Sequence, residues 1–140
     1  MNRNFNGTQI NSSVTIVEKA GADIEDCRNR ILKYDDNGNV VLAAAGTDIS
    51  IGVALIEAGS NDITGRESGK VTAGDDVDIQ IKDIGYVLAG ADIAKGSEVT
   101  SGADGKAAVA TSGNYVLGIA LSKASAGGYV RIQYSKYQKA

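Results

Sequence analysis

The sequence predicts an all-β fold, a small β-barrel or sandwich of about ten short strands built from an internal duplication. Short runs in which apolar and polar residues alternate recur along the 140 residues, as expected for strands with one buried face. The chain contains 18 glycines and no proline, so Gly, Asn and Asp must form the turns. Several sequence markers recur in the same order in both halves, which indicates a duplication.

Four pairs of matching segments define a first copy at 14–81 and a second copy at 84–134. The pairs are 20–24 with 89–93, 37–38 with 104–105, 51–55 with 117–121, and 73–81 with 126–134. Their offsets are 69, 67, 66 and 53 residues, so the first copy contains about 13 additional residues before position 73. Chance matching in an Ala- and Gly-rich chain is the alternative, and the shared order of four matches argues against it.

Ten segments are expected to form strands: 14–17, 30–34, 39–43, 50–57, 76–82, 85–88, 98–101, 106–111, 115–122 and 129–135. Residues 35–38 read Asp-Asp-Asn-Gly and predict a hairpin turn. Segment 23–30 is the best helical candidate, but its counterpart in the second copy reads as a turn, so a turn or one short helix is expected. Gly52 and Gly118 interrupt apolar runs at equivalent positions and predict bulges or close backbone contacts.

By its length, the chain predicts one β domain at 14–140, preceded by a flexible arm at 1–13. The arm is polar and Asn-rich, and Phe5 and Ile10 are its apolar anchors for a neighbouring protein. Arg66 and Lys70 belong to the enlarged loop region of the first copy and are expected to be exposed. These four residues are the candidate partner contacts.

Charge is distributed unevenly along the chain. Residues 1–83 contain 14 acidic and 8 basic side chains, and residues 84–140 contain 3 acidic and 6 basic ones. The halves therefore carry net charges of −6 and +3 within an overall −3. An acidic chain argues against nucleic acid as a partner. The asymmetry reflects either drift after duplication or a bipolar surface that pairs copies or contacts a partner.

The residues that commonly support catalysis are scarce. The chain has no histidine, which removes the most frequent general base and transition-metal ligand. It has neither a Walker nor a dinucleotide-binding glycine pattern. Asp76 and Asp78 alternate with apolar residues and indicate a solvated strand face rather than a catalytic carboxylate pair. We therefore expect no enzyme activity and no cofactor.

Metal and membrane sites are not expected either. Residues 35–39 match the first oxygen positions of a calcium loop, but Val40 stands where glycine is required and Gly46 where glutamate is required. The single cysteine, Cys27, excludes an internal disulfide and is expected to be a small buried apolar residue. No apolar run reaches the length of a membrane span, and no signal peptide is recognisable.

The second copy resembles the capsid-cement, or head-decoration, proteins of tailed phages. The matching segments are VLAGADI at 87–93, KGSEV at 95–99, DGKA at 104–107, LGIAL at 117–121 and AGGYVRI at 126–132. The first copy looks like the first half of the same family with an enlarged loop at 59–69. Together the two copies cover about 120 residues. The resemblance implies a compact, often trimeric all-β protein that braces capsid subunits from outside and has no catalytic residues.

The expected function is therefore a non-enzymatic structural protein of the virion. It is made in the host cytoplasm, decorates the outer capsid surface, and stabilises the head by bridging capsid subunits. The expected partner is the major capsid protein, a homotrimer is one possible assembly, and neither nucleic acid nor a membrane is expected. The alternative is a sugar- or receptor-binding β-module of a phage fibre or cell surface, which exposed aromatic residues along a groove would favour.

Overall fold

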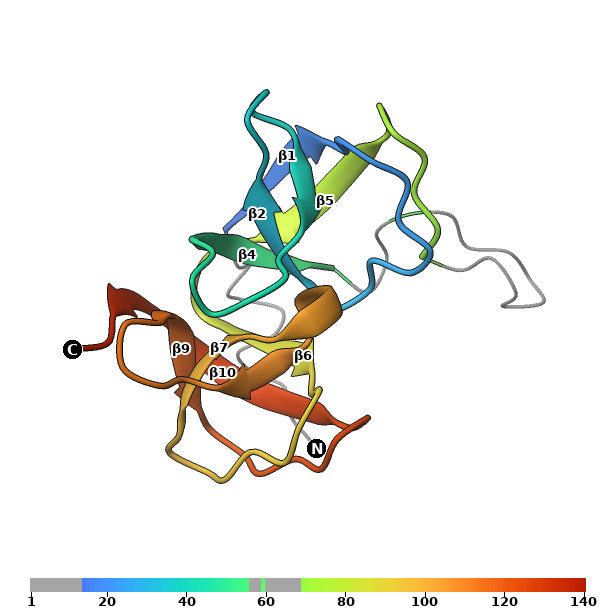
Figure 1. The fold of residues 1–140 in the computed structure, drawn as a ribbon. Helices are drawn as coiled ribbons and strands as arrows, with labels where there is room; N and C mark the ends of the chain where they lie inside the picture. The colour runs from blue at the N-terminus through green and yellow to red at the C-terminus, as the bar shows by residue number, and fades with distance from the viewer. Residues whose placement is uncertain (1–13, 56–58, 60–68) are drawn as a thin grey trace.

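The computed structural model describes residues 14–55, 59 and 69–140, and these contain ten strands and no α-helix (Figure 1). The all-β prediction and its strand count are therefore confirmed. The elements are β1 (Thr15–Lys19), β2 (Ile31–Tyr34), β3 (Val40–Leu42), β4 (Ser50–Ala54), β5 (Asp76–Gln80), β6 (Ile84–Leu88), β7 (Glu98–Ser101), the short 3-10 turn η2 (Ala103–Gly105), β8 (Ala107–Val109), β9 (Tyr115–Ala120) and β10 (Tyr129–Gln138).

The described strands form two antiparallel five-stranded sheets with the same topology. The first sheet has the order β1-β5-β4-β2-β3, and the second has the order β6-β10-β9-β7-β8. In each sheet an isolated parallel bridge joins the residue after one edge strand to the other edge strand, Ala20 to Val40 of β3 and Ala89 to Ala107 of β8. The two bridges differ by the offsets read from the sequence, as the duplication predicts.

Alternation along the strands determines which faces are buried. In β10, Val130 and Ile132 are fully buried, whereas Arg131 and Gln133 are exposed. β5 follows the same rule, and its Asp76 and Asp78 lie on the solvent side. Burial of each Val or Ile side chain contributes about 1.5–3 kcal/mol, and a shift of one residue would expose all of them.

Segment 23–30 forms turns rather than a helix. Asn29 has a left-handed φ of 57°, which ends any helical path. Its counterpart in the second copy is Gly96, with φ of 89°. The backbone N–H of each residue donates to the strand at the matching place, to Ala54 at 3.0 Å and to Ala120 at 2.7 Å. Asp26 supports the turn, because its carboxylate accepts a hydrogen bond from the backbone N–H of Arg28 at 3.1 Å.

Gly52 and Gly118 occupy equivalent close contacts, as predicted. A Cβ atom on Gly52 would lie 2.2 Å from the carbonyl oxygen of Gln80, and one on Gly118 would lie 2.3 Å from that of Gln133. Both obstacles are main-chain atoms of the neighbouring strand. Any side chain at these positions would push two strands of a sheet apart.

The repeats are joined through their cores and backbones. Among the described residues, one apolar cluster lies within the first repeat, while the other combines the second repeat with Ile31, Ala43 and Val53 of the first. Gly105 donates its N–H to the carbonyl of Ala43 at 2.7 Å, across the boundary between the repeats. Figure 1 shows the first repeat, in blue and green, against the second, in yellow to red. The division into an arm and one domain stays a prediction.

Candidate interaction surfaces

The structure describes one of the four candidate partner contacts. Lys70 is exposed and precedes Val71, which pairs with Ile24 in an isolated bridge. Phe5, Ile10 and Arg66 lie outside the described residues, so their grouping stays a prediction. Within the described ranges, no cluster of three potential metal ligands occurs. The same ranges contain no helix long and apolar enough to cross a membrane.

The outer side of strands β6 and β10 forms an apolar surface, here called the β6–β10 face. Antiparallel pairing sets Tyr86 opposite Arg131 and Ile84 opposite Gln133, so these side chains share one side of the sheet. Ile84, Tyr86 and Tyr129 are all more than half exposed. Large apolar side chains grouped on one exposed face are typical of an interaction surface.

The equivalent side of the first repeat, here called the β1–β5 face, is polar. Lys19 and Asp76 are paired across the strands and form an ion pair of 2.7 Å. Val17 is the counterpart of Tyr86 and lies opposite Asp78. The two repeats thus share one backbone topology, although the outer face of the first repeat is charged and that of the second is apolar. Folding alone therefore does not require the tyrosines and isoleucine of the β6–β10 face, which points to a role in binding.

Arginine side chains accompany this apolar surface. Arg131 lies on the face itself, in the middle of β10. Arg28 binds the carboxylate of Asp26 through two hydrogen bonds, of 3.0 and 2.9 Å, and this contact lowers the pKa of Asp26. The pKa of Arg28 is raised, first by its hydrogen bond to Asp26 and to a smaller extent by Tyr129. The surface therefore combines apolar rings with positive charge.

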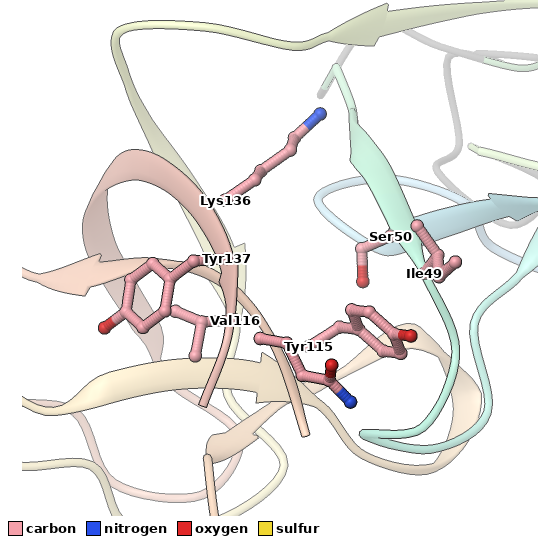
Figure 2. Close-up of a pocket in the computed structure, with 7 residues that line it drawn as sticks. Ile49, Ser50, Tyr115, Val116, Lys136 and Tyr137 are labelled. Atoms are coloured by element: carbon pink, nitrogen blue, oxygen red, sulfur yellow. The ribbon is translucent and has the colours of Figure 1, made fainter. Parts of the chain in front are cut away.

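An open groove of about 220 Å³ lies where the two repeats meet. Figure 2 shows β4 and the residue before it on one wall, and β9 and the end of β10 on the other. Its lining residues are Ile49, Ser50, Tyr115, Val116, Lys136, Tyr137 and Gln138. Ile49 is 65% exposed despite being apolar, so the groove presents hydrophobic surface to solvent.

Polar groups in the groove are only partly paired. The Nζ of Lys136 donates to the carbonyl oxygen of Ile51, and burial lowers the pKa of this lysine. Within the described residues, no carboxylate forms an ion pair with Lys136. The Ser50 side chain lies on the groove side of β4 (Figure 2), where its residue is 6% exposed and its hydroxyl has no hydrogen-bond partner in the described structure.

A neighbouring polar cluster holds the end of the chain in place. Lys139 and the hydroxyl of Tyr137 both donate to the carboxylate of Glu98. These two contacts, Lys139 first, lower the pKa of Glu98. The cluster fixes the last turn of the chain beside the groove, and its groups are already occupied by one another.

The cysteine and the buried tyrosine are structural. Burial raises the pKa of Cys27 to about 11, so its thiol stays protonated near neutral pH and the predicted apolar role is confirmed. Burial also raises the pKa of Tyr134, whose hydroxyl lies beside Gly85 without a hydrogen-bond partner in the described structure. Neither group is placed to act on a bound molecule.

The sequence sets Tyr129, Tyr134 and Tyr137 near Arg131 and Lys136. This pattern suggests base stacking or, more in keeping with an acidic chain, core and rim packing. Neither interpretation identified the two surfaces.

The β6–β10 face was detectable, because comparison of the two copies sets Tyr86 against Val17 and Tyr129 against Asp76 at outward strand positions. The groove had no such signal, since it combines residues 49–50 with residues 115–138 through the packing of the two repeats.

Comparison with known proteins relates this fold to a phage head. No family model and no curated protein matches the sequence. Among solved structures, the chain is similar to the N base of the head fibre gp8.5 of bacteriophage phi29, with 25% identity and a TM-score of 0.65. The similarity covers 92% of this chain and 99% of that chain. It therefore supports the broader expectation of a phage head-associated structural fold, without selecting the capsid-cement family.

Proposed function

We propose that this protein is a non-enzymatic structural component of a bacteriophage head, attached to the outer surface of the capsid. The observation that carries the proposal is the similarity to the phi29 head fibre base, which extends over nearly the whole of both chains. The sequence resemblance to head-decoration proteins, made independently on the segments of the second copy, supports the same location.

The β6–β10 face is the surface proposed to contact the major capsid protein. Its rings provide apolar area for burial, and Arg131 provides positive charge for an acidic counterpart. Aromatic and arginine side chains are the residues on which binding energy most often concentrates. In this arrangement the β1–β5 face remains directed towards solvent or towards an adjacent subunit.

Repetition over the capsid lattice strengthens the attachment. A molecule that bridges two capsid subunits, or that joins its own copies into a trimer, makes its second contact at a high effective concentration. Weak individual contacts then give stable decoration of the head. Bridging and trimer formation are both part of the proposal and are tested by the stoichiometry on the particle.

The test compares Tyr86→Asp with Val17→Asp. The two residues are equivalent in the two repeats and are similarly exposed, at 54% and 56%. We expect Tyr86→Asp to weaken binding to purified heads by at least about tenfold, since loss of a central aromatic contact costs more than about 1.4 kcal/mol. Val17→Asp should bind normally.

Co-sedimentation with heads measures binding, and thermal melting confirms that both variants fold. Normal decoration by Tyr86→Asp would remove the β6–β10 face from the proposal. Failure of the unmodified protein to bind heads at all would reject the head-attachment function.

A second function, sugar or receptor binding, is favoured by one observation. Tyr115 and Tyr137 line the same groove (Figure 2), and Lys136 and Gln138 are also among its lining residues. Rings next to hydrogen-bonding groups suit a carbohydrate. Binding on a glycan array that is lost in Tyr115→Ala would support this alternative, and an array without any binding would reject it.

A further inference from the structure

Strand β4 is paired along only part of one edge. On the edge that faces β5, β4 is paired at Val53 and Ala54. No described strand pairs with residues 50–52 along that edge. On its other side, β4 pairs with β2 as far as Ser50. The first half of β4 therefore has a sheet edge that opens into the groove between the repeats.

The edge is open because β5 ends early. Asp83 adopts a left-handed φ of 74° and directs the chain away from β4 into β6. The side chain of Gln80 holds this turn by donating to the carbonyls of Lys82 at 3.0 Å and Ile84 at 2.8 Å. The departure of the chain is thus fixed by specific hydrogen bonds.

The second repeat shows the same place filled. There β10 continues beyond the equivalent position and pairs with β9 at Gly118, Val116 and Tyr115. Gly118 is the counterpart of Gly52, so residues 135–138 of β10 lie where the first repeat has no strand. One chain therefore contains a filled and an unfilled version of a single strand position.

The open edge presents backbone hydrogen-bonding groups. Leu55 donates its N–H to Asp78 of β5, and Val53 pairs with Gln80. The register between β2 and β4 shifts at Ile51, which has no partner residue on β2. The carbonyl of Ile51 accepts a hydrogen bond from Lys136, a side chain that occupies the position of a missing strand. The hydroxyl of the preceding residue, Ser50, has no hydrogen-bond partner in the described structure.

We propose that an extended, acidic segment of a head protein binds in this groove and adds to the open edge of β4 as a strand. The inference deepens the proposed function and rests on it, because the head supplies the segment. Backbone hydrogen bonds to Ile51 hold the segment, its apolar side chains cover Ile49, and its carboxylate pairs with Lys136. Residues 1–13 lack this chemistry, since they contain Arg3 and no acidic residue.

Hydrogen exchange on the particle tests the strand directly. Free and head-bound protein are exchanged in deuterated buffer, digested with pepsin, and compared by mass spectrometry over peptides that contain residues 49–55. We expect the amide of Ile51 to exchange at least about tenfold more slowly in the bound state, because its hydrogen bond to the added strand must break before the amide can exchange. Peptides that contain Leu117, in the filled position, should show equal exchange in both states.

A charge reversal supplies the matched mutational test. Lys136→Glu should weaken head binding by roughly tenfold at low salt, since it sets like charges together. Lys95→Glu makes the same charge change on an exposed turn before β7 and should leave binding unchanged. A thermal melt of both variants shows whether the fold is retained.

The possible outcomes separate this inference from the proposed function. Absence of any binding to heads rejects both. Normal binding with unchanged exchange at residues 49–51 rejects the strand alone, as does normal binding by folded Lys136→Glu. The amide of Ile51 could already exchange slowly in the free protein and lose this protection when residues 2–12 are deleted. That result would assign the groove to the protein's own N-terminal segment and overturn the proposal.

Discussion

Replacement of Gly118 by alanine should destabilise the protein by about 2–3 kcal/mol. The added Cβ would lie 2.3 Å from the carbonyl oxygen of Gln133 and 3.2 Å from the Cα of Tyr134. Both atoms belong to the main chain of β10, which cannot rotate away as a flexible side chain does. The upper part of the overpacking range of about 1–3 kcal/mol therefore applies. Valine at this position should cost at least as much.

The glycine at position 102 provides a matched control. A Cβ there would be 3.4 Å from the Cβ of Ala108, an ordinary contact, and the backbone φ is −100°. Gly102→Ala should change stability by less than about 1 kcal/mol, with a small gain from reduced freedom of the unfolded chain. The comparison separates the close backbone approach from a general effect of losing a glycine.

Urea unfolding followed by far-ultraviolet circular dichroism measures both variants. For a chain of this length, each 1 kcal/mol corresponds to roughly 3–4 °C in Tm, so Gly118→Ala should melt about 6–12 °C lower. Gly52→Ala, with its Cβ 2.2 Å from the carbonyl of Gln80, should behave alike. If Gly118→Ala and Gly102→Ala unfold at the same urea concentration, the β9–β10 contact does not exclude a side chain and the reasoning is wrong.

Three further predictions concern the arm, the thiol and the particle. Deletion of residues 2–12 should leave Tm nearly unchanged but weaken head binding, because a polar arm gains order only on a partner; equal decoration by the truncated protein would contradict this. Cys27 should resist a thiol reagent at pH 8 until the protein is unfolded, since burial raises its pKa to about 11. Because the native thiol holds its proton more tightly than the unfolded one, its contribution to the free energy of unfolding should decrease above pH 9. A free energy of unfolding that does not change with pH above 9 would refute this. Decorated heads should release DNA at a higher temperature than bare heads, with a difference that shrinks as salt screens the charged halves; identical release temperatures at every salt concentration would remove the stabilising role.

The strand pattern could be predicted because it depends on local sequence. Val130 and Ile132 alternate with polar residues, and the burial of alternate side chains follows directly from strand geometry. The close contacts at Gly52 and Gly118 were predictable for a related reason, since an isolated glycine in an apolar run is costly unless the backbone requires it. The repeated order of markers then gave two copies with one topology.

The turns and the groove could not be predicted in the same way. Asp23 and the acidic residues after it are compatible with the start of a helix. Only comparison with the second copy, where Gly96 stands at the place of Asn29, favours the turn that the structure shows. The open edge of β4 depends on Asp83, a non-glycine residue with positive φ. Such residues are held in place by tertiary contacts, here those of Gln80, and local propensity does not reveal them.

Asn29 makes the joint between the repeats directional. Its side-chain amide donates to the carbonyl of Tyr86 at 3.1 Å, and its own carbonyl accepts from the N–H of Leu88 at 3.0 Å. Both contacts fasten the first repeat to β6, the strand that opens the second. Gly96 stands at the matching place in the second repeat and has no side chain with which to fasten a third. The joint therefore runs in one direction, from the turn before β2 to β6, and the two repeats are not interchangeable in order.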